Sequence, residues 1–239
     1  MLSISKSGFF LLAAGAVCIA GGLVAAPPVS SPIPLEKGNR WTYEGKIETA
    51  LSGSSTVYST NISWVMEVID SIKSTNAQAA VVRGFPDELP WYEPAQVPGF
   101  CVLLNFSNHV YQIKAPNEKQ ARSILQDVIN EPGKFSAKAQ DFNELLALPL
   151  AKDKRWGGDA KREDGYYCWR IEEVRRETLH IEGISSNQTV TTYRLAYRSL
   201  PDHQLVDVVP GLGITRYAFA HHGTIASVDV HLVSFKHPQ

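Results

Sequence analysis

The stretch GITRYAFAHHGTIASVDVHLVSF, residues 213–235, decides the fold of this chain. Polar and apolar residues alternate on both sides of His222-Gly223, with the two-residue period of a half-buried β-strand. A tight turn at His222-Gly223 would gather the apolar residues of both halves on one face. It would also place Arg216 opposite Asp229 on the other face, a favourable pair of opposite charges. The stretch therefore predicts an antiparallel hairpin. The apolar pairs expected are Phe219–Ala226, Tyr217–Val228 and Thr215–Val230.

The hairpin contains three histidines, and this raises the question of a metal or catalytic site. In the expected register His221 and His231 point to opposite faces, and the adjacent His221 and His222 also diverge. A metal ion would need a further ligand from elsewhere, such as His203. We therefore expect surface histidines beside a turn, and no cofactor. The alternative is a metal-dependent hydrolase that uses His221, His222 and His203, with Asp229 as a further candidate.

A second hairpin is predicted near the start of the folded part. The segment WTYEGKIE, residues 41–48, alternates strictly, and residues 58–68 alternate in the same way. A turn at Ser52-Gly53 would put all the large apolar side chains on one side, as expected for an antiparallel pair. The pairs expected are Ile47–Tyr58, Tyr43–Ile62 and Trp41–Trp64.

The remainder of the chain predicts more short strands and few helices. Residues 117–130 have helical spacing of apolar residues and end before Pro132-Gly133, and 141–150 is a second, shorter helix or turn. Residues 86–99, with Trp91 and Tyr92, and residues 152–165 are expected to be loops. Short strands separated by turns are typical of a meander or barrel. We predict a mainly β (α+β) fold: a curved antiparallel sheet or unclosed barrel of about ten strands with one or two covering helices. Further strands are expected at 77–85, 100–106, 109–114, 166–174, 177–183, 189–199 and 203–209.

The N-terminus differs from the rest of the chain. Residues 1–26 contain one basic residue, Lys6, followed by an uncharged apolar stretch, as in a secretory signal peptide. The apolar stretch 8–26 is also just long enough to span a bilayer, so an uncleaved membrane anchor is the alternative. Residues 27–34 are a proline-rich linker, and 35–239 form a single β-rich domain. We expect an exported protein, in the periplasm or outside the cell, that contacts a membrane only through the N-terminal segment if this is not cleaved.

Composition and motifs exclude several classes of function. The formal net charge is −1, without the basic excess typical of nucleic-acid binding. Cys101 and Cys168 form no CxxC motif; after export they are either a disulfide or two buried free thiols. The Gly211-x-Gly213 pattern precedes a strand, whereas a dinucleotide loop opens a helix. Patterns of serine hydrolases, zinc proteases and P-loop proteins are absent.

Three blocks resemble those of a group of uncharacterised exported bacterial proteins. The first is PLxxGxxWxY near the N-terminus, the second surrounds Tyr167-Cys168-Trp169, and the third is GxGxxxYxxxHHGT, residues 211–224. The resemblance implies export and a β-rich fold, but no activity. The expected architecture is also similar to the periplasmic lipoprotein-carrier fold, in which an unclosed barrel surrounds an apolar cavity. The residues matching the first and third blocks are Pro34, Leu35, Gly38, Trp41, Tyr43, Gly211, Gly213, Tyr217, His221, His222, Gly223 and Thr224.

The function expected from these patterns is that of a non-enzymatic envelope protein that binds a lipid, another amphipathic ligand or an envelope protein partner. Several aromatic residues are predicted to share the concave side of the sheet, where they could face a ligand or simply fill a core. The metal-dependent hydrolase and a membrane-anchored structural module are the alternatives. The ligand-facing candidates are Trp41, Tyr43, Tyr58, Trp64, Tyr217 and Phe219.

Overall fold

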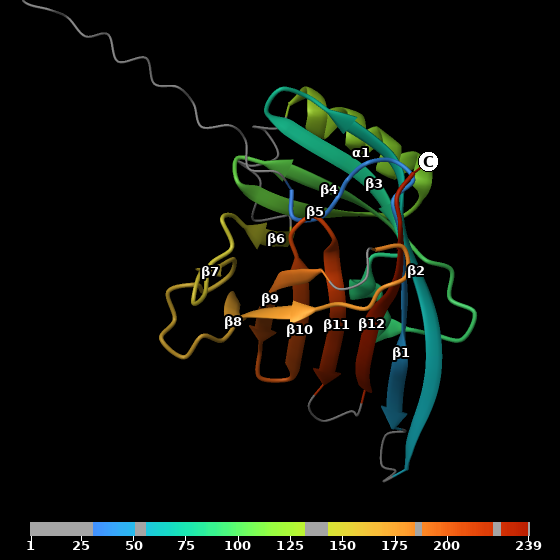
Figure 1. Cartoon of the computed structure of the whole chain (residues 1–239), viewed down its shortest axis with the longest axis vertical. Helices are drawn as coiled ribbons and strands as arrows, with labels where there is room; N and C mark the ends of the chain where they lie inside the picture. Colours follow the sequence, from blue (N-terminus) through green and yellow to red (C-terminus); the bar gives the residue numbers. More distant parts are fainter. Residues whose placement is uncertain (1–30, 51–55, 132–142, 185–187, 222–225, 239) are drawn as a thin grey trace, which may run out of the picture.

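In a computed structural model, the chain forms one curled antiparallel sheet of twelve strands (Figure 1). The structure describes residues 31–50, 56–131, 143–184, 188–221 and 226–238. The strand order is β6-β5-β4-β3-β2-β1-β12-β11-β10-β9-β8-β7, so that β1 and β12, from opposite ends of the domain, pair at the centre. The strands are β1 (Arg40–Ala50), β2 (Val57–Lys73), β3 (Ala77–Arg83), β4 (Phe100–Phe106), β5 (His109–Ala115), β6 (Asn143–Ala147), β7 (Arg155–Trp156), β8 (Trp169–Thr178), β9 (Thr189–Arg198), β10 (Asp202–Val209), β11 (Gly213–His221) and β12 (Ala226–Lys236).

The curl brings the two edge strands, β6 and β7, towards each other. Trp156 in β7 donates a hydrogen bond from its indole nitrogen to the backbone oxygen of Glu144 in β6, at 3.3 Å. Among the described residues no strand ladder joins β6 to β7, so the sheet is a barrel with one open seam. The prediction of a mainly β, unclosed barrel is confirmed, with twelve strands where about ten were expected.

Both predicted hairpins are present, but each expected register was wrong by two residues. Tyr43 lies opposite Trp64 rather than Ile62, and Tyr217 lies opposite Val230 rather than Val228. The expected turns at Ser52-Gly53 and His222-Gly223 lie outside the described residues, so the registers are given by the paired strands on either side. A shift of two residues leaves every side chain on its predicted face, because the side-chain period of a strand is two.

The concave side of the sheet is packed with apolar side chains. This core includes residues of all twelve strands and of several segments outside the sheet, two of which were not expected there. One is the 3-10 helix η1 (Pro86–Trp91), whose Leu89 is fully buried, although residues 86–99 were expected to be a loop. The other precedes β1, where Ile33 and Leu35 are buried, so the end of the expected linker belongs to the core.

The helix predicted at 117–130 is α1 (Glu118–Asn130), and it covers the opposite face of the sheet over β3 and β4 (Figure 1). The side chain of Asn117 caps it by accepting a hydrogen bond from the backbone N–H of Gln120. Its apolar stripe, which includes Leu125, packs on Val102 and Leu104 in a second, smaller core. In the part of the chain that the structure describes, no helix is both long and apolar enough to cross a bilayer.

Three other expectations about local structure were wrong. The stretch predicted as a second helix contains strand β6, because a short apolar run such as Leu145-Leu146-Ala147 fits either element. In the expected strand 177–183, β8 ends at Thr178, and Glu182 instead makes an isolated bridge with Ser234 of β12. The loop expected at 152–165 contains the two-residue strand β7.

Candidate functional site: a trough on the outer face of the sheet

Most of the predicted ligand-facing aromatic residues lie in the core. Trp41, Tyr43, Trp64 and Tyr217 are each at most 4% exposed. Trp41 donates from its indole to the backbone oxygen of Leu212 at 2.7 Å, and the Tyr43 hydroxyl donates to that of Ile214 at 3.0 Å. Burial raises the pKa of the Tyr43 and Tyr217 hydroxyls well above the usual value. These side chains are therefore core residues, and the polar atoms of Trp41, Tyr43 and Trp64 are satisfied by backbone oxygens of the protein.

The other two aromatic candidates have different surroundings. Phe219 is partly buried against the core, and its position on β11 borders a surface pocket. Tyr58 lies near the start of β2 and is 53% exposed. In the segment 86–99, Trp91 is exposed, whereas Tyr92 packs edge-on against Trp64, with ring centroids 6.4 Å apart.

Cys101 and Cys168 are buried free thiols in the structure, and no disulfide joins them. Cys101 lies in β4 and faces the core. Cys168 precedes β8, with its sulfur 3.6 Å from the backbone oxygen of Gly165. Burial raises the pKa of both thiols above the usual value, so neither is a reactive thiolate.

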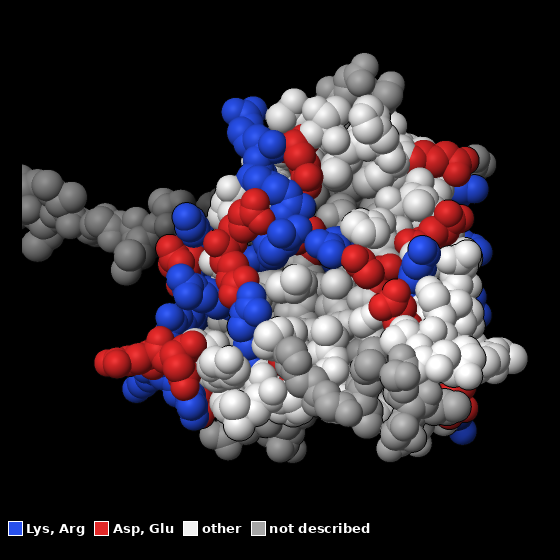
Figure 2. Space-filling view, turned by 90° about the horizontal axis from the view of Figure 1, so that it is seen from below, with Lys and Arg blue, Asp and Glu red and all other residues white. Residues whose placement is uncertain are grey.

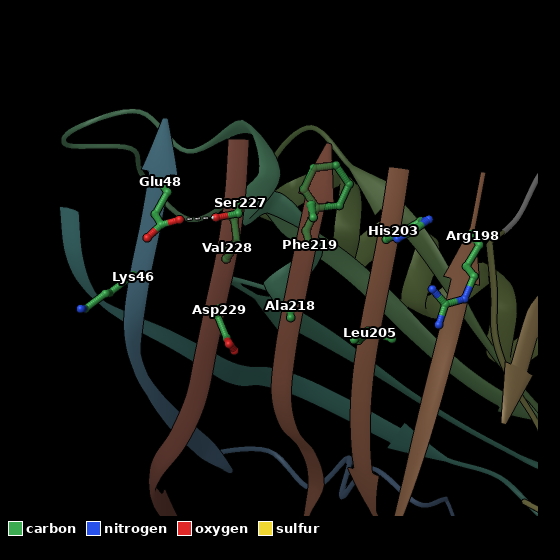
Figure 3. Close-up of a pocket in the computed structure, with 11 residues that line it drawn as sticks. Lys46, Glu48, Arg198, His203, Leu205, Ala218, Phe219, Ser227, Val228 and Asp229 are labelled. Carbon is green, nitrogen blue, oxygen red and sulfur yellow. Dashed lines mark hydrogen bonds between the residues drawn. The ribbon is translucent and has the colours of Figure 1, made fainter. Parts of the chain in front are cut away.

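The pocket is a trough on the outer face of the sheet, of about 490 Å³ (Figure 3). Its lining comes from five adjacent strands, β1, β12, β11, β10 and β9, and mainly from residues that alternate with the core residues. Two cross-strand rows form it. The first row is Lys46, Asp229, Ala218 and Leu205, and the second is Glu48, Ser227, Ala220, His203 and Arg198.

Small side chains on β11 create the hollow. Ala218 and Ala220 stand at its centre, and Leu205 of β10 lies directly across from Ala218. The longer side chains on either side of these alanines rise above them. The floor is therefore apolar, whereas the two ends of the trough carry charged side chains (Figure 3).

The charged groups at the ends differ in how they are paired. At one end Glu48 accepts a hydrogen bond from the Ser227 hydroxyl at 3.1 Å. At the other end Arg198 makes two hydrogen bonds to the carboxylate of Glu172. Lys46 makes no ion pair or hydrogen bond to any residue that the structure describes. Its ammonium group is therefore the positive charge at the trough that is not already neutralised.

A ladder of ion pairs borders the trough on the same outer face. Asp207 of β10 is 3% exposed and accepts hydrogen bonds from Arg194 and Arg175 at 2.8–3.0 Å. Burial by itself would raise the pKa of this carboxyl, but the two arginines outweigh burial and hold the pKa below its usual value. Figure 2 shows acidic and basic side chains interleaved across the lower end of the molecule rather than separated by sign.

The expected pair of Arg216 and Asp229 is part of this ladder. Arg216 lies directly opposite His231, not Asp229, yet its guanidinium reaches Asp229 with two hydrogen bonds of 2.9 and 2.8 Å. The predicted ion pair is therefore present, but the prediction that the two residues lie directly opposite each other was wrong. Burial by itself would raise the pKa of the Asp229 carboxyl. The hydrogen bond and charge of Arg216 lower this pKa by more, so the net shift is downwards.

The histidines considered as metal ligands have separate partners. His221 Nδ1 lies 2.6 Å from Asp202 Oδ1, and His231 Nε2 lies 3.2 Å from Asp229 Oδ1. His203 lines the trough, and His222 lies outside the described residues. Among the described residues, no group of three histidine, cysteine, aspartate or glutamate side chains is arranged to hold a metal ion.

Sequence reasoning identified His203, Phe219 and Asp229 near this site, but not its floor or its unpaired cation. The alternation in GITRYAFAH could have revealed the floor, since the small residues Ala218 and Ala220 alternate with Tyr217 and Phe219. Lys46 falls on the polar face of the alternating segment 41–48, a pattern that does not distinguish it from the other polar residues there. The trough itself could not be found from one strand, because five strands contribute to it.

Comparisons with known proteins give only distant likenesses. No family model and no curated protein sequence matches this chain. Its structure is similar to that of "a putative exported protein with YmcC-like fold" from Bacteroides fragilis NCTC 9343, with 13% identity and a TM-score of 0.39. It is similar at 12% identity and the same TM-score to "a putative lipoprotein" from Parabacteroides distasonis ATCC 8503. Each comparison covers 86% of this chain and 98% of the other. Likenesses of this size do not establish a shared fold, and export of this chain remains a prediction from its N-terminal sequence.

Proposed function

We propose that the chain is an exported, non-catalytic protein that binds an amphipathic ligand in the outer trough. The observation that carries this proposal is an apolar floor, made by Ala218, Ala220 and Leu205, between charged ends. A volume of about 490 Å³ lies within the range of small-molecule sites. The packed interior favours the outer face over the concave side as the place of binding.

The charges at the two ends of the trough indicate where the head group of the ligand would lie. Arg198 and Asp229 are already paired with Glu172 and Arg216, so a ligand gains little from either. Lys46 has no such partner among the described residues, and an ammonium group attracts carboxylates and phosphates. We therefore expect a single apolar chain along the floor, with an anionic head group beside Lys46.

The proposal is tested with a dansylated undecanoic acid as the probe, titrated into the purified protein and followed by fluorescence. Ala218→Trp would place an indole in the trough and should weaken binding about tenfold or more. Ser63→Trp is the matched control, since Ser63 is an exposed position on the adjacent strand β2, beside Glu44 and outside the trough. This variant should bind the probe like the unaltered chain.

A second pair of measurements separates the head group from the apolar chain. Lys46→Glu should weaken binding of the acid probe several-fold and leave binding of the corresponding dansylated alcohol unchanged. If the unaltered protein does not bind the probe, or if Ala218→Trp binds it as well as Ser63→Trp does, the trough is not a site for such ligands. Binding of an amphipathic peptide in place of the lipid probes would also contradict the proposal and indicate a protein partner.

A further inference from the structure

The lower half of β2 is paired with β1 on one side and with no described strand on the other. β1 pairs with β2 over the whole range Val57–Glu67, but β3 pairs with β2 only over Glu67–Lys73. In Figure 1 this part of β2 borders the molecule at the lower right, with no strand beyond it. The side of β2 that faces away from β1 is therefore not paired with any described strand before Glu67.

The backbone geometry shows which groups point out of this edge. Val68 donates its N–H to Asn39 and accepts from Gly38, so its backbone groups face the β1 side. The β1–β2 register has no bulge from Val57 to Glu67, and backbone groups alternate in direction along a strand. The N–H and C=O groups of Val57, Ser59, Asn61 and Ser63 consequently point away from β1. Those of Val65 also point outwards, but Gly84 lies against the Val65 oxygen.

The residues of this edge are suited to pairing with another strand. The segment VYSTNIS, residues 57–63, contains no charged residue and no proline, the two devices that commonly protect an exposed edge. Val57 and Tyr58 are 45% and 53% exposed, so the edge also presents apolar surface to solvent. None of the four outward-pointing residues makes a hydrogen bond to another described residue on this side.

We propose that a second copy of this chain pairs with this edge, so that two β2 strands join antiparallel across a two-fold axis at Thr60. This register lets all four outward-pointing residues exchange backbone hydrogen bonds, Val57 with Ser63 and Ser59 with Asn61. It also places Tyr58 of each copy beside Ile62 of the other, which covers the exposed ring. Shifting the axis to Ser59 would leave Ser63 unpaired, and shifting it to Asn61 would require Val65, which Gly84 blocks.

The absence of charge favours a second copy as the occupant. An antiparallel two-fold pairing places residues at the axis next to their own equivalents, so any charge near the axis would meet a like charge. Here Thr60 meets Thr60, and its neighbours Ser59 and Asn61 are uncharged and can hydrogen-bond. The edge of one copy can therefore pair with the same edge of a second copy.

Sedimentation velocity of the full chain over a concentration series tests this pairing, and a reversible dimer is expected. Thr60→Lys would set two ammonium groups opposite each other and should raise the dissociation constant about tenfold or more. Thr60→Glu should do the same. A mixture of the two variants should restore the dimer, because opposite charges then meet at the axis. Thr189→Lys, an exposed position on the internal strand β9, is the control and should dimerise normally.

A backbone variant tests the hydrogen bonds directly. Ser59→Pro removes one outward-pointing N–H and leaves the ladder to β1 intact, so it should fold and fail to dimerise. Association through the N-terminal segment would not respond to any of these changes. A chain that stays monomeric at all concentrations would overturn the proposal. So would a Thr60→Lys dimer as tight as the original, or a monomer that adds an unrelated extended peptide to this edge.

Discussion

Asp207→Asn tests whether the ladder on the outer face stabilises the barrel. Asp207 is 3% exposed and accepts hydrogen bonds from two arginines, and Asn is close to it in size but uncharged. Breaking a fully buried ion pair costs about 3–5 kcal/mol, and breaking an exposed one about 0–1 kcal/mol. The arginine side chains are 25% and 26% exposed and keep Glu173 as a partner, so the loss should lie between these limits. We expect the free energy of unfolding to fall by about 2 kcal/mol, and Tm by about 4–8 °C.

The pH dependence of this loss has a definite sign. The folded-state pKa of Asp207 lies below that of the unfolded chain, about 3.9. A lowered pKa stabilises the fold above the unfolded-state pKa, and this stabilisation is lost as pH falls through the folded-state value. The difference between the unaltered chain and Asp207→Asn should therefore be full at neutral pH and shrink below about pH 4.

Urea unfolding followed by tryptophan fluorescence, at neutral and acidic pH, measures both effects. Asp229→Asn is the matched control on the same face, because Asp229 also holds an arginine by two hydrogen bonds but its side chain is 48% exposed. That variant should lose no more than about 1 kcal/mol. If Asp207→Asn loses as little as the control, or if its deficit is unchanged in acid, the reasoning about burial is refuted.

Two further predictions concern the core and the central strand pair. Gly45→Ala should destabilise the protein by about 1–3 kcal/mol or prevent folding, because the added Cβ would lie 2.0 Å from the backbone oxygen of Asp229. Thermal unfolding measures this loss, and a variant of normal stability would contradict the prediction. Cys101 should not react with iodoacetamide until the chain unfolds, since burial raises the pKa of its thiol. Mass spectrometry of native and urea-unfolded protein checks this, and rapid labelling of the native protein would contradict the prediction.

The sequence was sufficient for the fold class because the faces of the strands depend only on residue parity. Trp41, Tyr43 and Tyr217 were placed on the buried side correctly, although both hairpin registers were wrong by two residues. Register depends on the length of the connection between strands, which alternation does not report. Helix α1 was predictable from its spacing, whereas the apolar run 145–148 had no period that could separate strand from helix.

The trough could not be predicted because alternation does not report the register between strands. It depends on which residues lie across from one another on five strands, and therefore on register. In the expected register Ala218 would have lain beside Ser227, whereas in the structure it lies beside Asp229. A register wrong by two residues preserves the core and rearranges the surface, so sequence reasoning recovers what is buried more readily than what binds.

The buried aromatic residues also explain why binding is expected on the outside of this sheet. Trp41 and Tyr43 of β1 donate to backbone oxygens of Leu212 and Ile214, at the start of β11. The Ile214 oxygen is at a bulge, where the register of β10 and β11 shifts and the ladder is interrupted. A ligand that entered between β1 and β11 would break these hydrogen bonds and leave buried carbonyls unpaired, at about 1–3 kcal/mol each. The outer trough requires no such rearrangement, because it is already open and a ligand there would break no hydrogen bond of the core.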